Sequence, residues 1–366
     1  MSGKSVRIKD IAQKAGVSTG TVDRVIHNRG KVAEDVREKV LKIIEEMNYE
    51  PNLIARALGA NKTYSLGALI PDPQADSYWL EPRAGVEKAE KALKHYGVAV
   101  KKYLFDPYDV ASFQAQALAL LAGAHDGVVI SPVFYRESLP YFEALQQAGT
   151  PFVIFNSQIS EYTPLSYIGS DLYTSGLLAG KLFHYGLPAP CTLLVAHIDE
   201  RAANASHLGK KEKGFRNYFV QHHLEEQYPI VAAELDRSNM AAFIGQLDSL
   251  IEDNPRLGGI FVTTSKAYSI ASYMEQRRIK HIRLIGYDLL PQNLHYLQQE
   301  QIQFLINQGP FGQGYWSVYY LAEHVILGKE IPLMKYMPLD IVTRENVNYY
   351  LPEHDEKPLL EHKVSL

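Results

Sequence analysis

Residues 7–26 read RIKDIAQKAGVSTGTVDRVI, and their spacing predicts two short helices joined by a tight turn. The apolar residues of 8–15 recur at i, i+3, i+4 and i+7, which places them on one helical face. Gly16 can adopt the left-handed conformation that ends this helix, and Ser18 can cap a second helix whose apolar face lies in 22–26. Two helices joined in this way form a helix-turn-helix, whose second helix reads the major groove of DNA. The stretch therefore predicts a DNA reader.

Length and composition limit the class of protein. The chain has 366 residues, of which 46% are hydrophobic, so it can bury a sizeable core and form two or three domains. No apolar run reaches the roughly 20 residues that span a membrane, and the first residues lack the apolar core of a signal peptide. The single cysteine, Cys191, excludes a disulfide within this sequence and fits a reducing compartment. We therefore expect a cytoplasmic protein without a membrane partner.

The net charge of −4 is divided unevenly along the chain. Residues 1–62 hold 12 Lys and Arg against 8 Asp and Glu, whereas the remainder holds 25 against 33. A basic head on an acidic body is the distribution expected when only the head meets DNA phosphates. The excess in the head is modest, so it only supports the DNA-binding interpretation.

Two further pieces follow the helix-turn-helix. A third helix is expected from about Glu34, with apolar residues at core spacing over 36–47. Residues 48–52 (NYEPN) stop that helix. Residues 53–59 (LIARALG) form at most two helical turns, which are too short to be stable alone in water.

Together these pieces resemble the headpiece of the LacI/GalR (lac-repressor) family of bacterial transcription regulators. The resemblance runs unbroken from Arg7 to Leu58. It implies a homodimer that places two reader helices in successive major grooves of double-stranded operator DNA with a pseudo-palindromic sequence. It also implies hinge helices that fold on the operator and insert Leu58 into the minor groove. The alternative for Leu58 is packing on the body of the protein.

The resemblance also nominates residues for DNA contact. Thr19 and Gly20 lie where the family selects its bases, and Arg24 lies where the family contacts a base edge, for which a guanidinium suits guanine. Contacts to phosphates or through the hinge are implied for Thr21, His27, Asn28, Arg37, Asn52, Ala55 and Leu58. Asp23 replaces a small serine common in the family, and Gly20 has no side chain to read with. No operator sequence can therefore be copied from a relative.

From Tyr64 onward, β-rich runs alternate with helical runs. Strands are expected at 65–71, 98–104, 127–132, 151–156, 192–197, 259–264 and 283–287, and helices at 81–96, 110–122 and 139–148, with others between. Continuously apolar strands in this alternation predict parallel sheets covered by helices. About 290 residues of this pattern exceed one ordinary sheet. They predict two doubly wound, Rossmann-like lobes with a ligand between them, beyond the carboxyl ends of the strands.

The body resembles type I periplasmic sugar-binding proteins, as the effector domains of the LacI/GalR family do. The matching pieces include DGVVISPV, GTPFVIFN, YIGSDLYTSGLLAG, KKEKGF, GIFVTT, LIGYDLLP and MPLDIVTRENV, and LQQEQIQFLINQGPFGQGY is closer to the ribose-binding branch. The resemblance implies an effector site formed by Tyr78, Trp79, Asn156, Ser157, Lys211, Thr264, Ser265, Asp288 and Gln308. Aromatic rings would cover the C–H face of a sugar, while carboxylate, amide and ammonium groups would bind its hydroxyls.

Some of these residues have plainer interpretations. Tyr78 and Trp79 can be hydrophobic packing, and Asp288 can cap the next helix. The chain also departs from residues that are common in the family at three places: Asn156-Ser157 for Asp-Arg, Lys211 for Arg, and Thr264-Ser265 for Asn-Asp. Fewer carboxylates together with the cation Lys211 would also tolerate an acidic or phosphorylated sugar.

Motifs of catalysis and metal binding are absent from the sequence. No phosphate-binding loop, dinucleotide fingerprint, HExxH or CxxC pattern occurs. The one GxSxG match, residues 16–20, lies between two helices instead of after a strand, so it is a coincidence of the turn. The His and acidic residues of the tail, 354–362, lack an apolar frame that could fix metal ligands. We expect no enzyme, no cofactor and no metal.

The sequence thus predicts an N-terminal all-α helix-turn-helix headpiece (1–50), a hinge (51–62), an α/β effector and dimerisation domain of two doubly wound parallel-sheet lobes (63–350), and a tail (351–366). The predicted function is sequence-specific transcription regulation, with repression as the first choice, controlled by a sugar-like effector between the lobes. Two alternatives stay open: a sugar-sensing module whose head docks a protein, and a sugar-modifying enzyme. A steep fall in the affinity for duplex DNA as the salt concentration rises would exclude the first alternative.

Overall fold

The computed structural model describes residues 8–26, 30, 32–47, 62–159, 161–199 and 206–351. The chain divides into two compact units, residues 1–60 and 61–366. Five of the residues predicted to contact DNA lie outside the described ranges: His27, Asn28, Asn52, Ala55 and Leu58. The predicted limits of the hinge and of the C-terminal tail stay predictions.

The described part of the first unit contains three helices, α1 (Ile8–Ala15), α2 (Thr19–Ile26) and α3 (Glu34–Glu46). Gly16 follows α1 with a φ of +69°, a conformation that costs glycine little. Ser18 precedes α2, and its Oγ accepts a hydrogen bond from Thr21 N at 3.1 Å, as an N-cap does. The helix, turn and helix predicted for residues 7–26 are confirmed, and so is the start of the third helix.

A small apolar core holds these three helices together. Ile11, Val22, Val25 and Val40 are at most 4% exposed and pack in one cluster. At the surface, Lys14 Nζ lies 2.9 Å from Glu46 Oε2 and links α1 to the end of α3. An exposed pair of this kind contributes at most about 1 kcal/mol, so the apolar core carries most of the stability.

The second unit is built on two sheets, each of six strands within the described ranges. Lobe 1 has the strand order β11-β5-β4-β3-β1-β2, and lobe 2 has the order β12-β10-β9-β8-β6-β7. The strands of lobe 1 are β1 (Tyr64–Pro71), β2 (Val98–Phe105), β3 (Gly127–Ile130), β4 (Phe152–Phe155), β5 (Ser166–Gly169) and β11 (Met334–Tyr336). Those of lobe 2 are β6 (Thr192–Ile198), β7 (Ile230–Leu235), β8 (Leu257–Val262), β9 (Arg283–Tyr287), β10 (Phe304–Asn307) and β12 (Asp340–Val342). The two lobes therefore repeat one doubly wound topology.

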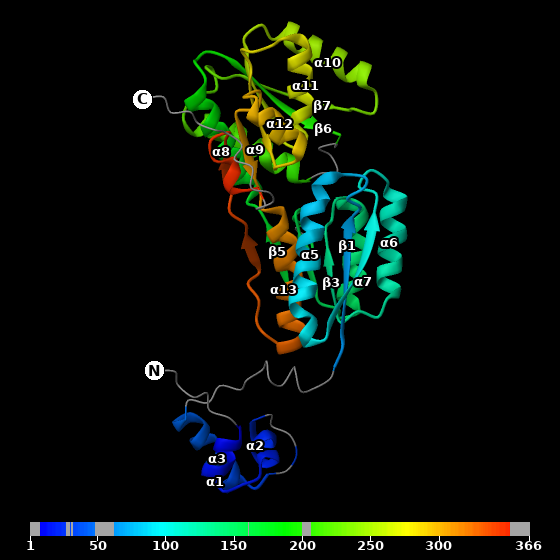
Figure 1. The fold of residues 1–366 in the computed structure, drawn as a ribbon, viewed down its shortest axis with the longest axis vertical. Coiled ribbons are helices and arrows are strands. Elements are labelled where there is room, and N and C mark those ends of the chain that lie inside the picture. Colours follow the sequence, from blue (N-terminus) through cyan, green and yellow to red (C-terminus); the bar gives the residue numbers. More distant parts are fainter. Residues whose placement is uncertain are drawn as a thin grey trace, which may run out of the picture. The chain divides into compact units, whose positions relative to one another are not determined.

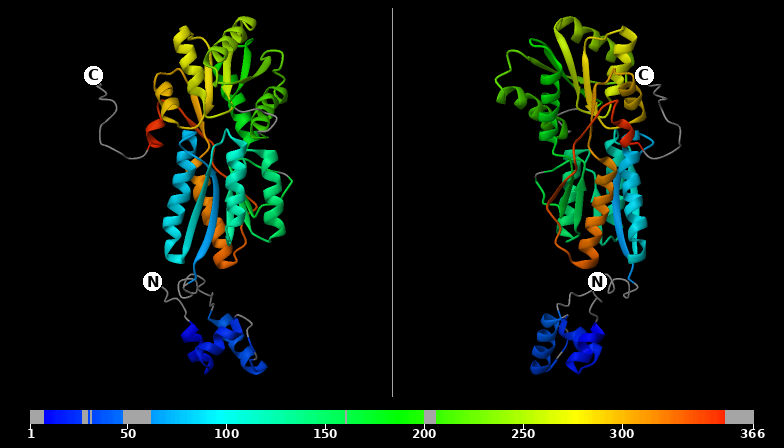
Figure 2. Two further views of the ribbon diagram at one scale, coloured as in Figure 1. Left: turned by 90° about the vertical axis from the view of Figure 1, so that its right-hand side faces the viewer. Right: turned by 60° about the vertical axis from the view of Figure 1, so that its left-hand side comes forward.

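Helices cover both faces of each sheet (Figures 1 and 2). On lobe 1, α5 (Leu80–Leu93) and α13 (Pro310–Leu327) cover one face, and α6 (Val110–Ala122) and α7 (Tyr135–Gln147) cover the other. On lobe 2, α8 (Leu172–Gly186) and α9 (Ser206–Gln221) cover one face, and α10 (Met240–Asp253), α11 (Ala267–Arg277) and α12 (Pro291–Gln298) cover the other. Short 3-10 turns complete the unit: η1 (Ser77–Trp79), η2 (Lys94–Tyr96) and η3 (Val347–Tyr349). None of the described helices is both long and apolar enough to cross a membrane.

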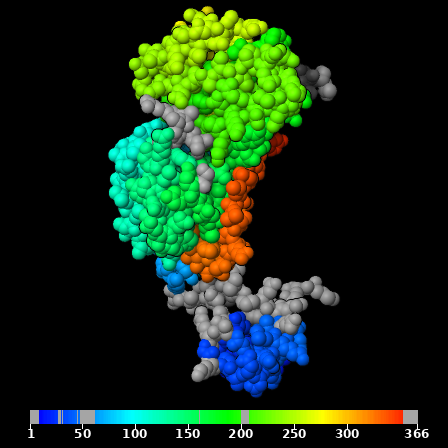
Figure 3. All heavy atoms as spheres, turned by 180° about the vertical axis from the view of Figure 1, so that it is seen from behind, coloured from blue at the N-terminus to red at the C-terminus, as the bar shows by residue number. Residues whose placement is uncertain are grey.

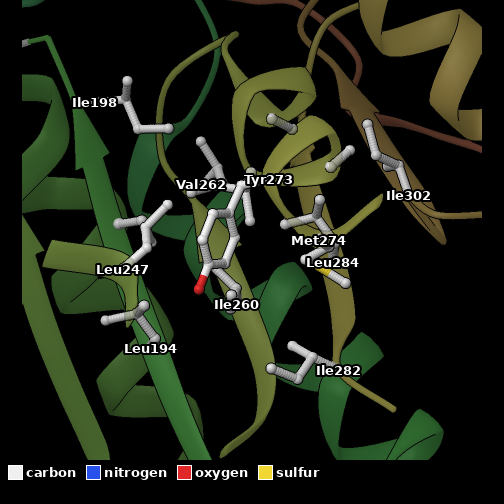
Figure 4. Close-up of a cluster of buried hydrophobic side chains, with 14 of the residues drawn as sticks. Leu194, Ile198, Leu247, Ile260, Val262, Tyr273, Met274, Ile282, Leu284 and Ile302 are labelled. Carbon is white, nitrogen blue, oxygen red and sulfur yellow. The ribbon is translucent and has the colours of Figure 1, made fainter. Parts of the chain in front are cut away.

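Each face of each sheet has its own apolar core. In lobe 2, Leu194, Ile260 and Leu284 come from three neighbouring strands and pack with Leu247 and Met274 from the covering helices (Figure 4). Full burial of a side chain of this size stabilises the fold by roughly 1.5–3 kcal/mol. This cluster and the three equivalent ones hold the edges of both sheets in fixed positions.

The sheets are parallel, as predicted, except where β10 pairs antiparallel with the edge strand β12. Strands β5, β7, β10, β11 and β12 were not predicted from the sequence, and β11 and β12 have only three residues each. Strands β5 and β10 have four residues each, and β7 reads IVAAEL with only Leu235 buried, so neither length nor alternation marks them as strands. The strand predicted at 259–264 ends at Val262, so its last two residues belong to the following loop.

Three short segments connect the lobes within the described ranges: residues 170–171, 308–309 and 337–339. Lobe 1 therefore contains α13 and β11, which come late in the sequence, after β10 of lobe 2. The C-terminal part of the chain, coloured orange to red, runs along one side of both lobes in the space-filling view (Figure 3).

Candidate DNA-binding face and effector cleft

The exposed side of α2 carries the residues that were predicted to contact bases. Thr19, Gly20 and Arg24 are exposed, whereas Val22 and Val25 of the same helix face the headpiece core. Arg24 Nε donates a hydrogen bond to the Gly20 carbonyl at 3.1 Å, which directs the guanidinium along the helix toward its first turn. An exposed guanidinium near the start of a reader helix can bind guanine in the major groove.

Two predicted phosphate contacts flank this face. Thr21 Oγ1 lies 2.9 Å from Ser18 Oγ, so the hydroxyl takes part in the polar cap of α2. Arg37 lies on α3 and is partly exposed. Asp23 on α2 is also partly exposed, so a carboxylate does lie on the helix that was predicted to read DNA.

The second unit has a cleft between its lobes, beyond the carboxyl ends of strands from both sheets. The cavity has a volume of about 70 Å³. Its lining contains every predicted effector residue except Asp288. Among the lining residues that were not predicted from the sequence are Asp76, Tyr108, His207 and Lys266. The predicted residues are thus brought together, although their role in binding stays a prediction.

Asp288 lies directly behind this lining and is 1% exposed. Its Oδ2 accepts hydrogen bonds from Ser265 Oγ at 2.6 Å and from Gln308 Nε2 at 2.9 Å. Its Oδ1 and Thr264 Oγ1 are buried and make no hydrogen bond to the described residues. Burial raises the pKa of Asp288, and the Ser265 hydrogen bond and the charge of Lys211 oppose that rise. A buried polar atom without a partner costs roughly 1–3 kcal/mol, so both atoms are strong candidates for ligand contacts.

Asp288 does not cap the next helix, so the capping alternative is wrong. Helix α12 begins at Pro291, and its N-cap is Leu290. Asp288 instead has a counterpart in lobe 1, because Asn156 after β4 and Asp288 after β9 have φ values of +69° and +64°. Strands β4 and β9 hold the same place in the two sheets, and Asn and Asp adopt this left-handed conformation more readily than most residues. Each lobe therefore has one short polar side chain at the same point of its strand edge.

Lys211 of α9 is 3% exposed. Its Nζ donates a hydrogen bond to the Thr263 carbonyl at 2.9 Å and lies 3.7 Å from the centre of the Tyr287 ring. The ammonium thus links α9 to the carboxyl ends of β8 and β9. Its charge also lies close enough to Asp288 to oppose the rise in the pKa of that carboxyl.

The aromatic pair after β1 belongs to both the cleft and the core. Tyr78 and Trp79 line the cleft but are only 7% and 6% exposed, and their rings meet edge to face at 5.0 Å. Trp79 also meets Phe155 edge to face at 6.2 Å. Asn156 Nδ2 donates a hydrogen bond to the Tyr78 hydroxyl at 2.6 Å. Hydrophobic packing therefore explains most of the ring area, and the small exposed part of each residue is what remains to meet a ligand.

An ion pair joins the two lobes at the cleft. Asp76 Oδ2 from lobe 1 accepts hydrogen bonds from Lys266 Nζ of lobe 2 at 3.1 Å and from Tyr108 at 2.8 Å. Asp76 Oδ1 accepts from Tyr78 N at 3.0 Å and so caps η1. A second contact between the lobes runs from Lys210 Nζ to Gln158 Oε1 at 2.7 Å.

These residues were not predicted from the sequence, for a definable reason. Asp76, Tyr108 and Lys266 each follow a strand, at the edge where ligands of such sheets bind. That rule alone could have nominated them, but nothing in the sequence pairs residues 190 positions apart, as Asp76 and Lys266 are.

A buried network supports the lobe 2 side of the cleft. His197 Nδ1 lies 2.7 Å from Thr263 Oγ1, and His197 Nε2 lies 2.8 Å from Glu212 Oε2. Arg216 Nε donates to Glu212 Oε1 at 2.7 Å. The hydrogen bonds from His197 and Arg216 lower the pKa of Glu212 to about 2.

The Glu212→Gln variant is expected to lose about 1–2 kcal/mol of unfolding free energy at neutral pH, allowing for the partial exposure of this side chain. Because the pKa of Glu212 is lowered on folding, its contribution is present above its ordinary value of 4.5 and is lost as the pH falls toward 2. The difference between the wild type and the variant, measured by urea unfolding, should therefore shrink on acidification. Glu225→Gln, at an exposed carboxylate of the same lobe, should show no such difference.

A helix-turn-helix unit followed by a two-lobed binding domain defines the class of ligand-responsive DNA-binding regulators. Residues 67–330 match the periplasmic binding protein domain, and residues 7–52 match the bacterial regulatory proteins of the lacI family. The chain therefore belongs to the periplasmic binding protein domain family over most of its length and, with the lacI-type reader at its start, is a lacI-family transcriptional regulator.

Known proteins match most of this chain. The chain is 26% identical over 288 residues to the ribose operon repressor of Halalkalibacterium halodurans, a match that covers 78% of this chain and 80% of that protein. It is 26% identical over 291 residues to the sucrose operon repressor of Pediococcus pentosaceus, covering 77% and 82%. A solved structure described as a LacI transcriptional regulator from Bacteroides fragilis matches with a TM-score of 0.74 at 29% identity, covering 79% of this chain and 100% of that one.

Proposed function

We propose that this protein is a homodimeric repressor that binds double-stranded operator DNA through α2. A sugar-like effector bound in the cleft raises or lowers its affinity for that DNA. The effector part of this proposal rests on two buried oxygens at the cleft, Asp288 Oδ1 and Thr264 Oγ1, which have no hydrogen-bond partner among the described residues. Both oxygens gain a hydrogen bond when a hydroxyl-rich ligand enters.

The chemistry and size of the cleft favour a small polyol. Asp288 Oδ1 can only accept a hydrogen bond when ionised, whereas Thr264 Oγ1 can donate or accept. The cavity of about 70 Å³ is small beside the roughly 300–1,000 Å³ of pockets for drug-sized ligands. The names of the ribose and sucrose operon repressors point to sugars of different size, so they support the ligand class without naming the ligand.

The position of the cleft also supports control of DNA binding by the effector. A ligand there contacts both lobes, so it binds one arrangement of the lobes better than another. This difference in affinity is the free energy available to change operator binding. In this proposal the protein binds its effector without converting it, acts in the cytoplasm, and needs neither a cofactor nor a membrane.

The proposal can be tested in two linked measurements. Purified full-length protein is screened by thermal shift against neutral sugars, polyols, sugar acids and sugar phosphates, since a ligand at about 100 times its Kd adds roughly 2.7 kcal/mol. Operator sequences are selected from random duplexes, and fluorescence anisotropy then measures their affinity with and without each hit. A hit that changes operator affinity supports the proposal. The proposal would be contradicted if duplex affinity did not depend on salt concentration, or if the hits left operator affinity unchanged.

Arg24→Ala is expected to lower affinity for the selected operator by about 1–3 kcal/mol and to relax specificity at one base pair, because it removes a base contact. Lys42→Ala provides the control, since Lys42 is an exposed cation on α3 instead of the reader helix. Anisotropy titrations against the operator and its single-base variants give both quantities. Equal losses on all sequences would instead assign Arg24 to the phosphate backbone.

A further inference from the structure

Lys266 lies at a position of the cleft that suits a negatively charged group. It is 5% exposed and is the N-cap residue of α11, an 11-residue helix in whose first turn Tyr268 N donates a hydrogen bond to Asn293 Oδ1 at 2.8 Å. The amino end of a helix carries partial positive charge, so here a helix end and an ammonium group act on the same space. Thr264 and Ser265, the residues just before this helix start, also line the cleft.

An unpartnered hydroxyl at the same place points independently to a ligand. Thr264 is 4% exposed, and its Oγ1 makes no hydrogen bond to the described residues. A hydroxyl can donate to an acid oxygen, so it fits an anion at the start of α11 as well as the helix end and Lys266 do.

The charges of the cleft are compatible with one added negative group. The described lining residues include two lysines, Lys211 and Lys266, and one carboxylate, Asp76. With Asp288 behind the lining, cations and carboxylates are equal in number. The positive end of α11 then favours a negative ligand over a neutral one.

We infer that the effector is an acidic sugar, with a carboxylate or phosphate group against Lys266, Thr264 and the start of α11 and a hydroxyl that donates to Asp288. This inference rests on the proposed function and specifies its ligand. It also revises the sequence-based hypothesis, in which Lys211 was the cation that would tolerate an acid. Lys211 is held by the Thr263 carbonyl and the Tyr287 ring, whereas Lys266 is held by another carboxylate, Asp76.

The ion pair with Asp76 gives the acid group a role in joining the lobes. Asp76 Oδ2 lies 3.1 Å from Lys266 Nζ and comes from the opposite lobe. An acid group of the ligand can share this ammonium with Asp76 or take its place, since both are oxygen acceptors with negative charge. Binding of the acid therefore acts on a contact that links the lobes. A neutral sugar has no negative group that could compete for Lys266.

Matched pairs of ligands test the inference directly. Thermal shift and calorimetry compare glucose with glucuronate, galactose with galacturonate, ribose with ribose 5-phosphate, and glucose with glucose 6-phosphate. We expect the acidic member of at least one pair to bind at least about 10-fold more tightly than its neutral partner, as charge-assisted hydrogen bonds allow. The uronate pairs and the phosphate pairs separate the two kinds of acid.

Variants of the ion pair then test the assigned contact. Lys266→Met should remove most of the preference for the acid, and Asp76→Asn should keep or strengthen it, because Asn can still cap η1 without competing as an anion. The double variant Asp76→Asn/Lys266→Met leaves no unpaired buried charge and keeps the test valid should Lys266→Met fold poorly. Lys210→Met is the matched control, because it also removes a lysine that joins the lobes, and it should leave the preference unchanged.

Each outcome bears on a different claim. Tight binding of neutral sugars with weaker binding of their acids would overturn this inference and leave the proposed function standing. A preference for the acid that survives Lys266→Met would overturn the assignment of the contact. Stabilisation by no member of any pair would count against the sugar effector itself.

Discussion

Replacing Asp288 by asparagine is expected to lower effector affinity by about 10- to 100-fold. This is the loss expected when a charged hydrogen-bond acceptor is replaced by a donor that faces another donor. The amide oxygen can keep the place of Oδ2 and accept from Ser265 and Gln308, so the fold of the site should persist. The amide nitrogen then takes the place of Oδ1, where it can only donate. A ligand hydroxyl that donates to Oδ1 in the wild type loses its acceptor.

Calorimetry with the sugar identified by the screen measures this loss. Operator affinity without effector should equal that of the wild type, since Asp288 lies in the effector domain. Asp253→Asn, at an exposed carboxylate at the end of α10, is the matched control and should leave both affinities unchanged. If Asp288→Asn bound the effector normally, the unpartnered oxygen would have to be explained by something other than the ligand.

Gly214→Ala is expected to destabilise the effector domain by about 3 kcal/mol, an effect at the upper end for overpacking a close contact. A Cβ at Gly214 would lie 2.0 Å from the Tyr173 carbonyl oxygen, and a Cβ at Gly176 would lie 2.0 Å from the Lys211 carbonyl oxygen. These are backbone atoms, so α8 and α9 would have to move apart. Lys211 lies one turn from Gly214 on α9, and its displacement should weaken effector binding as well.

The same helix supplies a control for this variant. Gly209 also lies in α9, but a Cβ there would meet nothing within 4 Å. Gly209→Ala should therefore be neutral or stabilising by up to about 1 kcal/mol, the ordinary gain of alanine over glycine in a helix. Urea unfolding followed by circular dichroism gives both values. Equal stability of the two variants would show that the helices can separate without cost.

Long apolar runs made much of the fold predictable. The strand at 65–71 is an unbroken run of this kind, and the helix predicted at 110–122 has the bounds that α6 shows. Strand β7 escaped prediction because IVAAEL lies at a sheet edge with partial exposure on both sides, a pattern that short helices share. The spacing of apolar residues indicates which side chains are buried, and few side chains are buried in a strand at the edge of a sheet.

The site was predictable only where a resemblance or a strand end marked it. Asp288 follows the strand at 283–287, which could be recognised in the sequence, whereas Gln308 follows β10, which could not, so the resemblance alone nominated Gln308. Lys266 was missed because a lysine before a helix is normally a solvated residue in a sequence read alone. Its burial results from the approach of Asp76 from the other lobe, and that depends on how the two sheets meet.

The interleaving of the lobes constrains how the protein is made. The sheet of lobe 1 has β11 as its edge strand, and α13 covers one of its faces, so lobe 1 is incomplete until residue 336 has left the ribosome. By then all strands of lobe 2 except β12 have been synthesised, so the two sheets become complete almost together instead of in the usual N-terminal-first order. No simple truncation yields either lobe intact, and separate expression of lobe 1 requires a circular permutation or a linker that joins residue 169 directly to residue 310.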